Sequence, residues 1–256
     1  MFFYVYDAFA LEPKHEGGLT RIENRIIELG INGRVEKLTP LRNLKSVIDT
    51  GIKSEAHTIV IVGGDETFLR SINIVAAHNI VLGYIPFATT SVCAPLLGIS
   101  DTIEACNILS RRIVKPFDLA KANQNYFWAC ATIAHGSAVT IRCNDNFTIS
   151  SRWPESQIRI DNLGNIFQSQ LSRQHISPAS RGTVTVDIQA SQKNNRWFKK
   201  HSQKDHTEIV VQRVVINHCN QPVAVVLDQV TTIKTPVTIT VKPKQLQLIV
   251  GKDRWI

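Results

Sequence analysis

Residues 58–78 read TIVIVGGDETFLRSINIVAAH, and this stretch decides the fold. It opens with an unbroken β-branched run over residues 58–62, which is typical of a strand buried on both faces in a parallel sheet. The turn Gly63-Gly64-Asp65-Glu66-Thr67 follows, and from Phe68 the apolar residues return at helical spacing. A glycine pair lets the backbone approach a ligand closely. The N–H groups that begin the helix favour an anion, so the stretch predicts a phosphate-facing corner.

The sequence before and after this corner alternates in the same way. Short apolar runs predict strands, and apolar residues at near-helical spacing predict helices. The expected strands are residues 2–6, 35–38, 58–62 and 80–85, and the expected helices are residues 19–29, 41–52 and 68–78. Thr20 and Glu23 form a plausible capping box for the first helix. This alternation predicts a doubly wound parallel sheet with right-handed crossovers.

After about residue 117 the pattern changes to short β-branched runs separated by polar turns. The expected strands there are residues 183–188, 208–216, 223–227, 238–241 and 245–250. We expect an α/β domain over residues 1–117, followed by an all-β domain over residues 118–256. The last strand could return to the first domain. The polar, basic segment 191–206 reads as a long exposed loop.

Composition narrows the class of protein. Apolar residues make up 43% of the 256 residues, which is enough for a substantial core, and no run approaches the roughly 18 apolar residues of a membrane span. Asp7 interrupts the apolar N-terminus, which lacks a basic leader and therefore reads as a strand. The five scattered cysteines predict reduced thiols in the cytoplasm. A net charge of +8 favours an anionic partner: a nucleotide, a lipid headgroup or nucleic acid.

The order of motifs adds a family resemblance. Residues 86–99 read PFATTSVCAPLLGI, and further motifs follow at residues 117–133, 176–179 and 226–238. With the Gly-Gly-Asp turn, these resemble the diacylglycerol kinase catalytic family, which includes bacterial lipid kinases. That family has Gly-Gly-Asp-Gly-Thr after a buried strand and Pro-x-Gly-Thr-x-Asn-Asp-x-Ala about twenty residues later. The resemblance covers nearly all of the chain.

The resemblance implies that residues 1–117 are a nucleotide-binding α/β domain and residues 118–256 a β-sandwich domain, with an ATP site between them. It also implies Mg²⁺ and transfer of the γ-phosphoryl group to a lipid hydroxyl such as that of diacylglycerol. Such a transfer needs N–H groups around the phosphates and a base for the hydroxyl proton. Carried over to this sequence, Asp228 would be the base. The implied phosphate-binding residues are Gly63, Gly64, Asp65, Glu66, Thr67, Ala88 and Thr89.

Several positions depart from the family pattern, and Glu66 is the most consequential because the family has glycine there. A carboxylate about 5 Å from a phosphate costs roughly 3 kcal/mol, or about a hundredfold in affinity. Glu66 could avoid this cost by pointing outward or by holding the metal itself. The other departures are Asp7-Ala8-Phe9 for Asn-Pro and a small-residue turn, Ala88 for glycine, Ser91-Val92 for Asn-Asp, Ser180-Arg181 for Asp-Asp, and Gln229-Val230 for Gly-Glu.

The basic and aromatic residues Trp197, Phe198, Lys199 and Lys200 could contact an anionic membrane, although a solvated loop is the default interpretation. His135 is more simply a structural histidine. The expected partners are a nucleotide and a lipid substrate at the inner face of the membrane. Nucleic acid is disfavoured, and a homodimer stays open.

Two hypotheses follow: an active lipid kinase with an altered site, and a catalytically inactive relative that binds nucleotide or lipid. An NAD kinase-like activity is a more distant alternative, because that related group shares the Gly-Gly-Asp turn.

Overall fold

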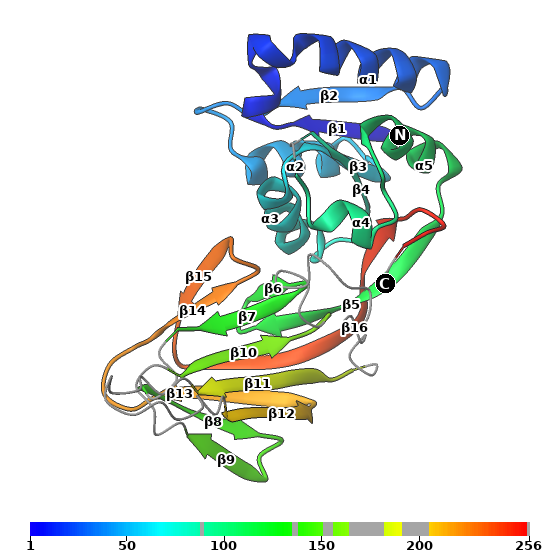
Figure 1. Cartoon of the computed structure of the whole chain (residues 1–256). Helices are drawn as coiled ribbons and strands as arrows, with labels where there is room; N and C mark the ends of the chain where they lie inside the picture. Colours follow the sequence, from blue (N-terminus) through cyan, green and yellow to red (C-terminus); the bar gives the residue numbers. More distant parts are fainter. Residues whose placement is uncertain (88–89, 135–137, 151–155, 164–181, 191–204, 255–256) are drawn as a thin grey trace, which may run out of the picture. The chain divides into compact units, whose positions relative to one another are not determined.

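The computed structural model describes residues 1–87, 90–134, 138–150, 156–163, 182–190 and 205–254 (Figure 1). The chain divides into two compact units, which we describe separately. Unit 1 comprises Met1–Phe117 and Lys244–Ile256, and unit 2 comprises Asp118–Pro243. The long strand β16 (Val237–Ile249) begins in unit 2 and ends in unit 1.

Unit 1 contains a parallel sheet in the order β2-β1-β3-β4. The strands are β1 (Phe2–Tyr6), β2 (Gly33–Lys37), β3 (Thr58–Gly63) and β4 (Val81–Pro86). The end of β16 adds a fifth parallel strand beside β4. Every residue of β3 is buried, so the prediction of a strand covered on both faces is confirmed.

The helices of unit 1 pack in neighbouring pairs, α1 with α5 and α2 with α3. The α-helices are α1 (Glu16–Glu28), α2 (Leu44–Lys53), α3 (Asp65–Val75), α4 (Cys93–Leu96) and α5 (Thr102–Arg111), and two 3₁₀ turns, η1 (Ala8–Leu11) and η2 (Pro13–His15), precede α1. The predicted capping box is wrong, because α1 begins at Glu16 without a side-chain cap. Thr20 lies inside this helix and donates its hydroxyl to the Glu16 carbonyl at 3.0 Å.

Unit 2 is formed by antiparallel strands in two sheets. One sheet has the order β12-β11-β10-β7-β14-β15, and in the other β13 pairs with both β16 and β8, and β8 pairs with β9. The strands are β5 (Val114–Ala122), β6 (Asn125–Phe127), β7 (Cys130–Ile133), β8 (Val139–Cys143), β9 (Phe147–Ser150), β10 (Gln157–Asp161), β11 (Val184–Ala190), β12 (Asp205–Val211), β13 (Arg213–His218), β14 (Ala224–Leu227) and β15 (Thr231–Lys234).

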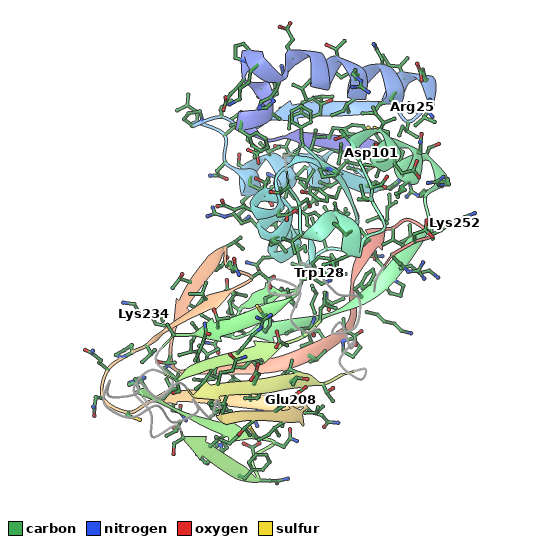
Figure 2. The ribbon with its side chains drawn as sticks, viewed as in Figure 1. Arg25, Asp101, Trp128, Glu208, Lys234 and Lys252 are labelled. Atoms are coloured by element: carbon green, nitrogen blue, oxygen red, sulfur yellow. The ribbon has the colours of Figure 1, made fainter. Side chains whose placement is uncertain are left out.

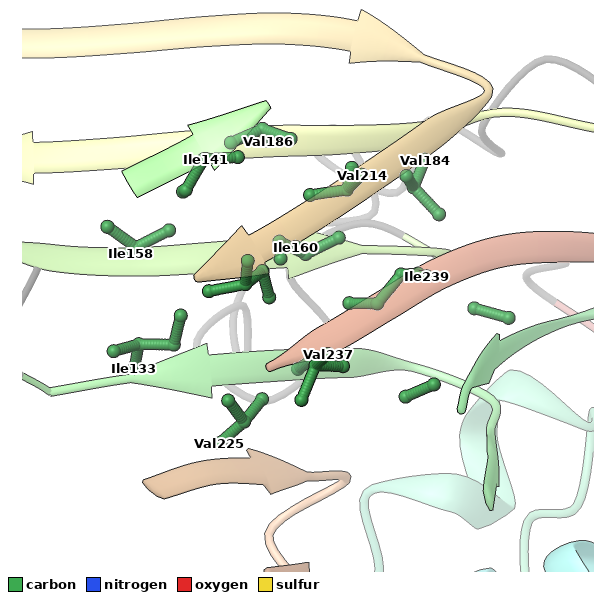
Figure 3. Close-up of a cluster of buried hydrophobic side chains, with 14 of the residues drawn as sticks. Ile133, Ile141, Ile158, Ile160, Val184, Val186, Val214, Val225, Val237 and Ile239 are labelled. Carbon is green, nitrogen blue, oxygen red and sulfur yellow. The ribbon is translucent and has the colours of Figure 1, made fainter. Parts of the chain in front are cut away.

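Branched apolar side chains from both sheets of unit 2 form one core, as Figure 3 shows for Ile158 and Ile160 of one sheet and Val214 and Ile239 of the other. The predicted fold class, an α/β part with a parallel sheet plus a β-sandwich, is confirmed. In the part of the chain that the structure describes, no helix is long and apolar enough to cross a membrane.

Two strand predictions need correction. The predicted strand over residues 208–216 is two strands, β12 and β13, which lie in different sheets. The predicted strands 238–241 and 245–250 are the single strand β16, which continues through Pro243. Lys244 has a left-handed φ of 54°, so the chain passes the proline with a local kink.

The hairpin between β14 and β15 holds two residues in the left-handed region. Asp228 has φ 48° and Gln229 has φ 61°, and the Val230 N–H donates to the Leu227 carbonyl at 3.0 Å. This is the geometry of a type I′ turn, in which glycine is favoured at the second central position. The resemblance places glycine where this chain has Gln229.

We therefore predict that Gln229→Gly stabilises the protein. The left-handed conformation costs a residue other than glycine roughly 1–2 kcal/mol, and the greater unfolded-state entropy of glycine removes part of the gain. The expected increase in the free energy of unfolding is about 0.5–1 kcal/mol, measured by urea denaturation. Gln221→Gly is the control, because Gln221 is exposed and has no positive φ; it should lower stability. If the free energy of unfolding fell equally in Gln229→Gly and Gln221→Gly, the left-handed conformation of Gln229 would not be strained.

Candidate functional site

The corner between β3 and α3 is built on two glycines with different roles. A Cβ added to Gly63 would lie 2.7 Å from the Asp7 Cβ, so only glycine fits beside the end of β1. Gly64 is the N-cap of α3 in an extended conformation and supplies no capping side chain. Among the described residues, no hydrogen bond engages the N–H groups of Asp65, Glu66 and Thr67. The N-terminus of α3 therefore presents unused donors and the positive end of the helix dipole.

The Asp65 carboxylate faces away from the N–H groups of its own helix. Oδ1 accepts hydrogen bonds from the Tyr84 hydroxyl at 2.9 Å and the Ser91 hydroxyl at 2.5 Å. Oδ2 accepts from the N–H groups of Val92 at 2.6 Å and Cys93 at 3.3 Å. Asp65 thus joins the start of α3 to β4 and to the turn before α4. Hydrogen bonds to a charged group contribute about 1.5–3 kcal/mol each, so this cluster fixes the corner strongly.

Glu66, the residue that replaces the family glycine, points into solvent. Its side chain is 68% exposed and forms an ion pair with Arg70, one helical turn later, at 2.8 Å. Such an exposed pair contributes about 0.5 kcal/mol or less. Of the two ways in which Glu66 could avoid repelling a phosphate, the structure shows the outward orientation.

Asp7 lies at the carboxyl end of β1 and is hydrogen-bonded to the corner. The Thr67 hydroxyl donates to Asp7 Oδ2, and the Asp7 N–H donates to the Val62 carbonyl at 2.9 Å. Thr67, which the resemblance assigned to phosphate, is therefore hydrogen-bonded to a carboxylate that the family does not usually have.

Three aromatic rings lie beside this corner. The rings of Phe9 and Phe87 are 6.4 Å apart, and His15 lies edge-on to both, at 6.1 Å from Phe9 and 5.4 Å from Phe87. A Cβ added to Gly64 would be 3.7 Å from the Phe9 ring. The sequence did not point to this group, because the rings come from segments about 70 residues apart that meet only once β1 and β4 lie in one sheet.

The remaining predicted residues do not all fall within the described chain. Ala88, Thr89, His135, Arg181 and the membrane-contact residues Trp197, Phe198, Lys199 and Lys200 lie outside it. So does the motif at residues 176–179. Gly63 to Thr67 belong to unit 1 and Asp228 belongs to unit 2.

Asp228, the candidate base, is 3% exposed and accepts three backbone hydrogen bonds. The donors are the N–H groups of Trp128 (Figure 2), Ala129 and Cys130, at 2.7, 2.8 and 2.9 Å. Burial raises the pKa of the Asp228 carboxyl to about 6, and the three N–H donors limit the rise. A general base must reach the hydroxyl proton that it accepts, whereas both oxygens here bind the backbone at the start of β7. Its catalytic role stays a prediction.

The raised pKa of Asp228 predicts how stability changes with pH. A buried carboxyl with a folded pKa of about 6 is favoured when protonated, so its contribution is full below pH 4 and is lost as the pH rises through 6. Relative to Asp228→Asn, which does not titrate, the wild type should lose roughly 2.5 kcal/mol of unfolding free energy between pH 4 and pH 7. The other carboxyls are common to both proteins, so their contributions cancel in this comparison. Denaturant titrations of the two proteins across this range measure it. A wild type that instead gains stability with rising pH would show that the three N–H donors outweigh burial.

Comparison with known proteins bears on the family and the fold. Residues 5–122 match the family model of the diacylglycerol kinase catalytic domain. No curated protein sequence matches the chain. Two similar solved structures are a diacylglycerol kinase from Bacillus anthracis str. Sterne (17% identity, TM-score 0.77) and a putative diacylglycerol kinase from the same strain (16% identity, TM-score 0.79). Each match covers 98% of this chain and 97% of that chain, and at this identity it shows the fold. The resemblance to the diacylglycerol kinase catalytic family that the motifs predicted is confirmed for residues 5–122, which the family model matches.

Proposed function

We propose that this protein is a lipid-kinase-like protein that binds the phosphates of ATP at the N-terminus of α3 and transfers the terminal phosphoryl group to a lipid hydroxyl, such as that of diacylglycerol. The observation that carries the proposal is the uncapped start of α3, where the N–H groups of Asp65, Glu66 and Thr67 are unused among the described residues. The match to the family model supplies the reaction class.

The physical basis is anion binding by backbone donors. The start of a helix following a glycine turn offers several N–H groups and a favourable dipole to one phosphate. Gly64 has no side chain to block the approach, and Glu66 is paired with Arg70 in solvent. Ala88 and Thr89 are proposed to line the same site on the resemblance alone. Trp197, Phe198, Lys199 and Lys200 are proposed on their composition to contact the membrane that holds the lipid.

The family suggests a metal ion as well as ATP, but the residues of the corner do not fit a magnesium ion held by the protein. Both oxygens of Asp65 are hydrogen-bonded, and Val92 has no ligand atom in its side chain. Within the described residues, no group of three His, Cys, Asp or Glu side chains could hold an ion. No step of the proposed transfer therefore depends on an ion ligated by this chain.

A second candidate is the catalytically inactive relative, which would bind the nucleotide or a lipid without turnover. It is favoured by the engagement of Asp228, whose carboxylate accepts three backbone N–H groups. The NAD kinase-like alternative is not proposed, because the family model that matches is the diacylglycerol kinase domain.

Gly64→Asp tests the phosphate site directly. Gly64 has φ −88° and ψ 170°, which suit an aspartate N-cap, and an added Cβ meets only the Phe9 ring at 3.7 Å. The new carboxylate should cap α3, adding about 0.3 kcal/mol to the stability of the free protein, and should exclude phosphate by occupying its donors. In thermal shift measurements, ATP should raise the Tm of the wild type. It should raise that of Gly64→Ala less, because the added methyl group narrows the approach, and should not raise that of Gly64→Asp. If millimolar ATP does not change the Tm of the wild type, the proposed phosphate site at the N-terminus of α3 is excluded.

Turnover separates the two candidate functions. Wild-type protein, γ-labelled ATP with Mg²⁺, and diacylglycerol in anionic vesicles should yield labelled lipid if the protein is a kinase. If Asp228 is the base, Asp228→Asn should abolish the labelling and leave the ATP-induced Tm shift unchanged. ATP binding without any labelled lipid would favour the inactive relative.

A further inference from the structure

We infer that the protein itself does not hold a divalent cation at the β3–α3 corner, because the Asp65 carboxylate acts as a structural clamp between α3 and the turn before α4. A divalent ion would then reach the corner only with the phosphates of a nucleotide. Only this second statement rests on the proposed function.

The first step is the number of donors on Asp65. An ionised carboxylate offers about four lone-pair sites. Two hydroxyls, from Tyr84 and Ser91, occupy Oδ1, and two backbone N–H groups, from Val92 and Cys93, occupy Oδ2. Magnesium needs a ligand oxygen at about 2.0–2.1 Å. An ion that close would face the positively polarised hydrogens of these donors, so Asp65 would have to release them first.

The second step is that neighbouring side chains cannot complete a coordination shell. Glu66 is directed to Arg70 in solvent, and Asp7 accepts the Thr67 hydroxyl. Val92 takes the place of a family aspartate without supplying an oxygen. In the described chain, no cluster of three suitable ligands exists anywhere.

The third step is a property of the sequence outside the described residues. Segments 164–181 and 191–204 contain no aspartate or glutamate. Across all of the segments outside the described residues, Glu155 is the one acidic residue. Within the described chain, Asp205 is the one acidic residue whose side chain is not described. Carboxylate ligands are what Mg²⁺ prefers in proteins, so these segments offer almost none.

The fourth step is that the clamp alone explains why an aspartate stands here. An amide in place of the carboxylate would present an NH₂ group to either the hydroxyl pair or the N–H pair, and would lose two acceptor sites. Tyr84 extends the clamp, because its hydroxyl also lies 3.3 Å from the Gly63 carbonyl and its ring stacks on Phe68 at 4.5 Å. The carboxylate therefore stabilises the corner in the absence of any ion.

The experiment combines a metal probe with stability measurements on Asp65→Asn. Free wild-type protein is titrated with Mn²⁺ and followed by electron paramagnetic resonance, and melting is recorded in EDTA and in Mg²⁺ without nucleotide. We expect no stoichiometric Mn²⁺ binding, and a fall in the Tm of Asp65→Asn of about 3 °C or more that is the same in EDTA and in Mg²⁺. Loss of a metal ligand would behave differently, because removing a charge from an empty cation site does not lower the stability of the free protein.

Stoichiometric binding of Mn²⁺ to the free wild type, lost in Asp65→Asn, would overturn the inference. An unchanged or higher Tm of Asp65→Asn in EDTA would also overturn it.

Tyr84→Phe and Ser91→Ala keep the test decisive if Asp65→Asn does not fold. Each removes one donor to Oδ1 and no carboxylate, so each should lower the Tm in EDTA without creating a Mn²⁺ site. Ser91→Ala also removes the acceptor of the Ala94 N–H. Their effects should be less than additive with Asp65→Asn, because all three break the same cluster. Full additivity would contradict the clamp.

These measurements are made without nucleotide. If ATP fails to bind, the proposed function is contradicted, but the inference about Asp65 is not affected. If ATP does bind, Mn²⁺ should bind only when ATP is present.

Discussion

The hydrogen bonds that converge on Asp65 are the interaction on which the site depends. Asp65 is the first residue of α3, and its donors come from β4 and from the turn that leads into α4. One carboxylate therefore fixes how two consecutive strand–helix units of the sheet meet at their carboxyl ends. Because this side chain turns toward its neighbours, it does not cap its own helix. The same contact that stabilises the corner thus leaves the N-terminus of α3 open to a ligand.

The sequence predicted the fold well where local pattern and tertiary environment agree. The β-branched run of β3 and the glycine pair after it identify a buried parallel strand and its turn, and both are as expected. It failed where one apolar run serves two sheets: β12 and β13 are continuous in pattern, yet the chain changes sheet at Gln212. It failed in the opposite way at Pro243, which suggested a break although β16 continues past it with Lys244 at a positive φ. The change of sheet at Gln212 and the continuation of β16 past Pro243 are both decided by strand pairing in the folded protein, which the local strand propensity of the sequence does not predict.

At the site, the sequence identified the positions better than their roles. Val92 reads as the loss of a family carboxylate, but its backbone N–H, which any residue except proline would supply, is a donor to Asp65. Glu66 reads as an obstacle to phosphate, and only the helix geometry shows it paired with Arg70. Asp228 reads as a base, whereas the fold surrounds it with N–H groups from a strand about 100 residues away. Backbone contacts between residues so far apart in the sequence cannot be predicted from a pattern of residue types.

The central claim is that the N–H groups at the start of α3, which have no hydrogen-bond partner among the described residues, receive the phosphates of a nucleotide. Titration of ¹⁵N-labelled protein with ATP, followed by the backbone amide resonances, tests it most directly. We expect the largest shifts at Gly64, Asp65, Glu66 and Thr67, and small shifts at Trp128, Ala129 and Cys130, whose N–H groups already bind Asp228. Unchanged amide resonances over Gly64 to Thr67 at saturating ATP, or shifts confined to other residues, would contradict it.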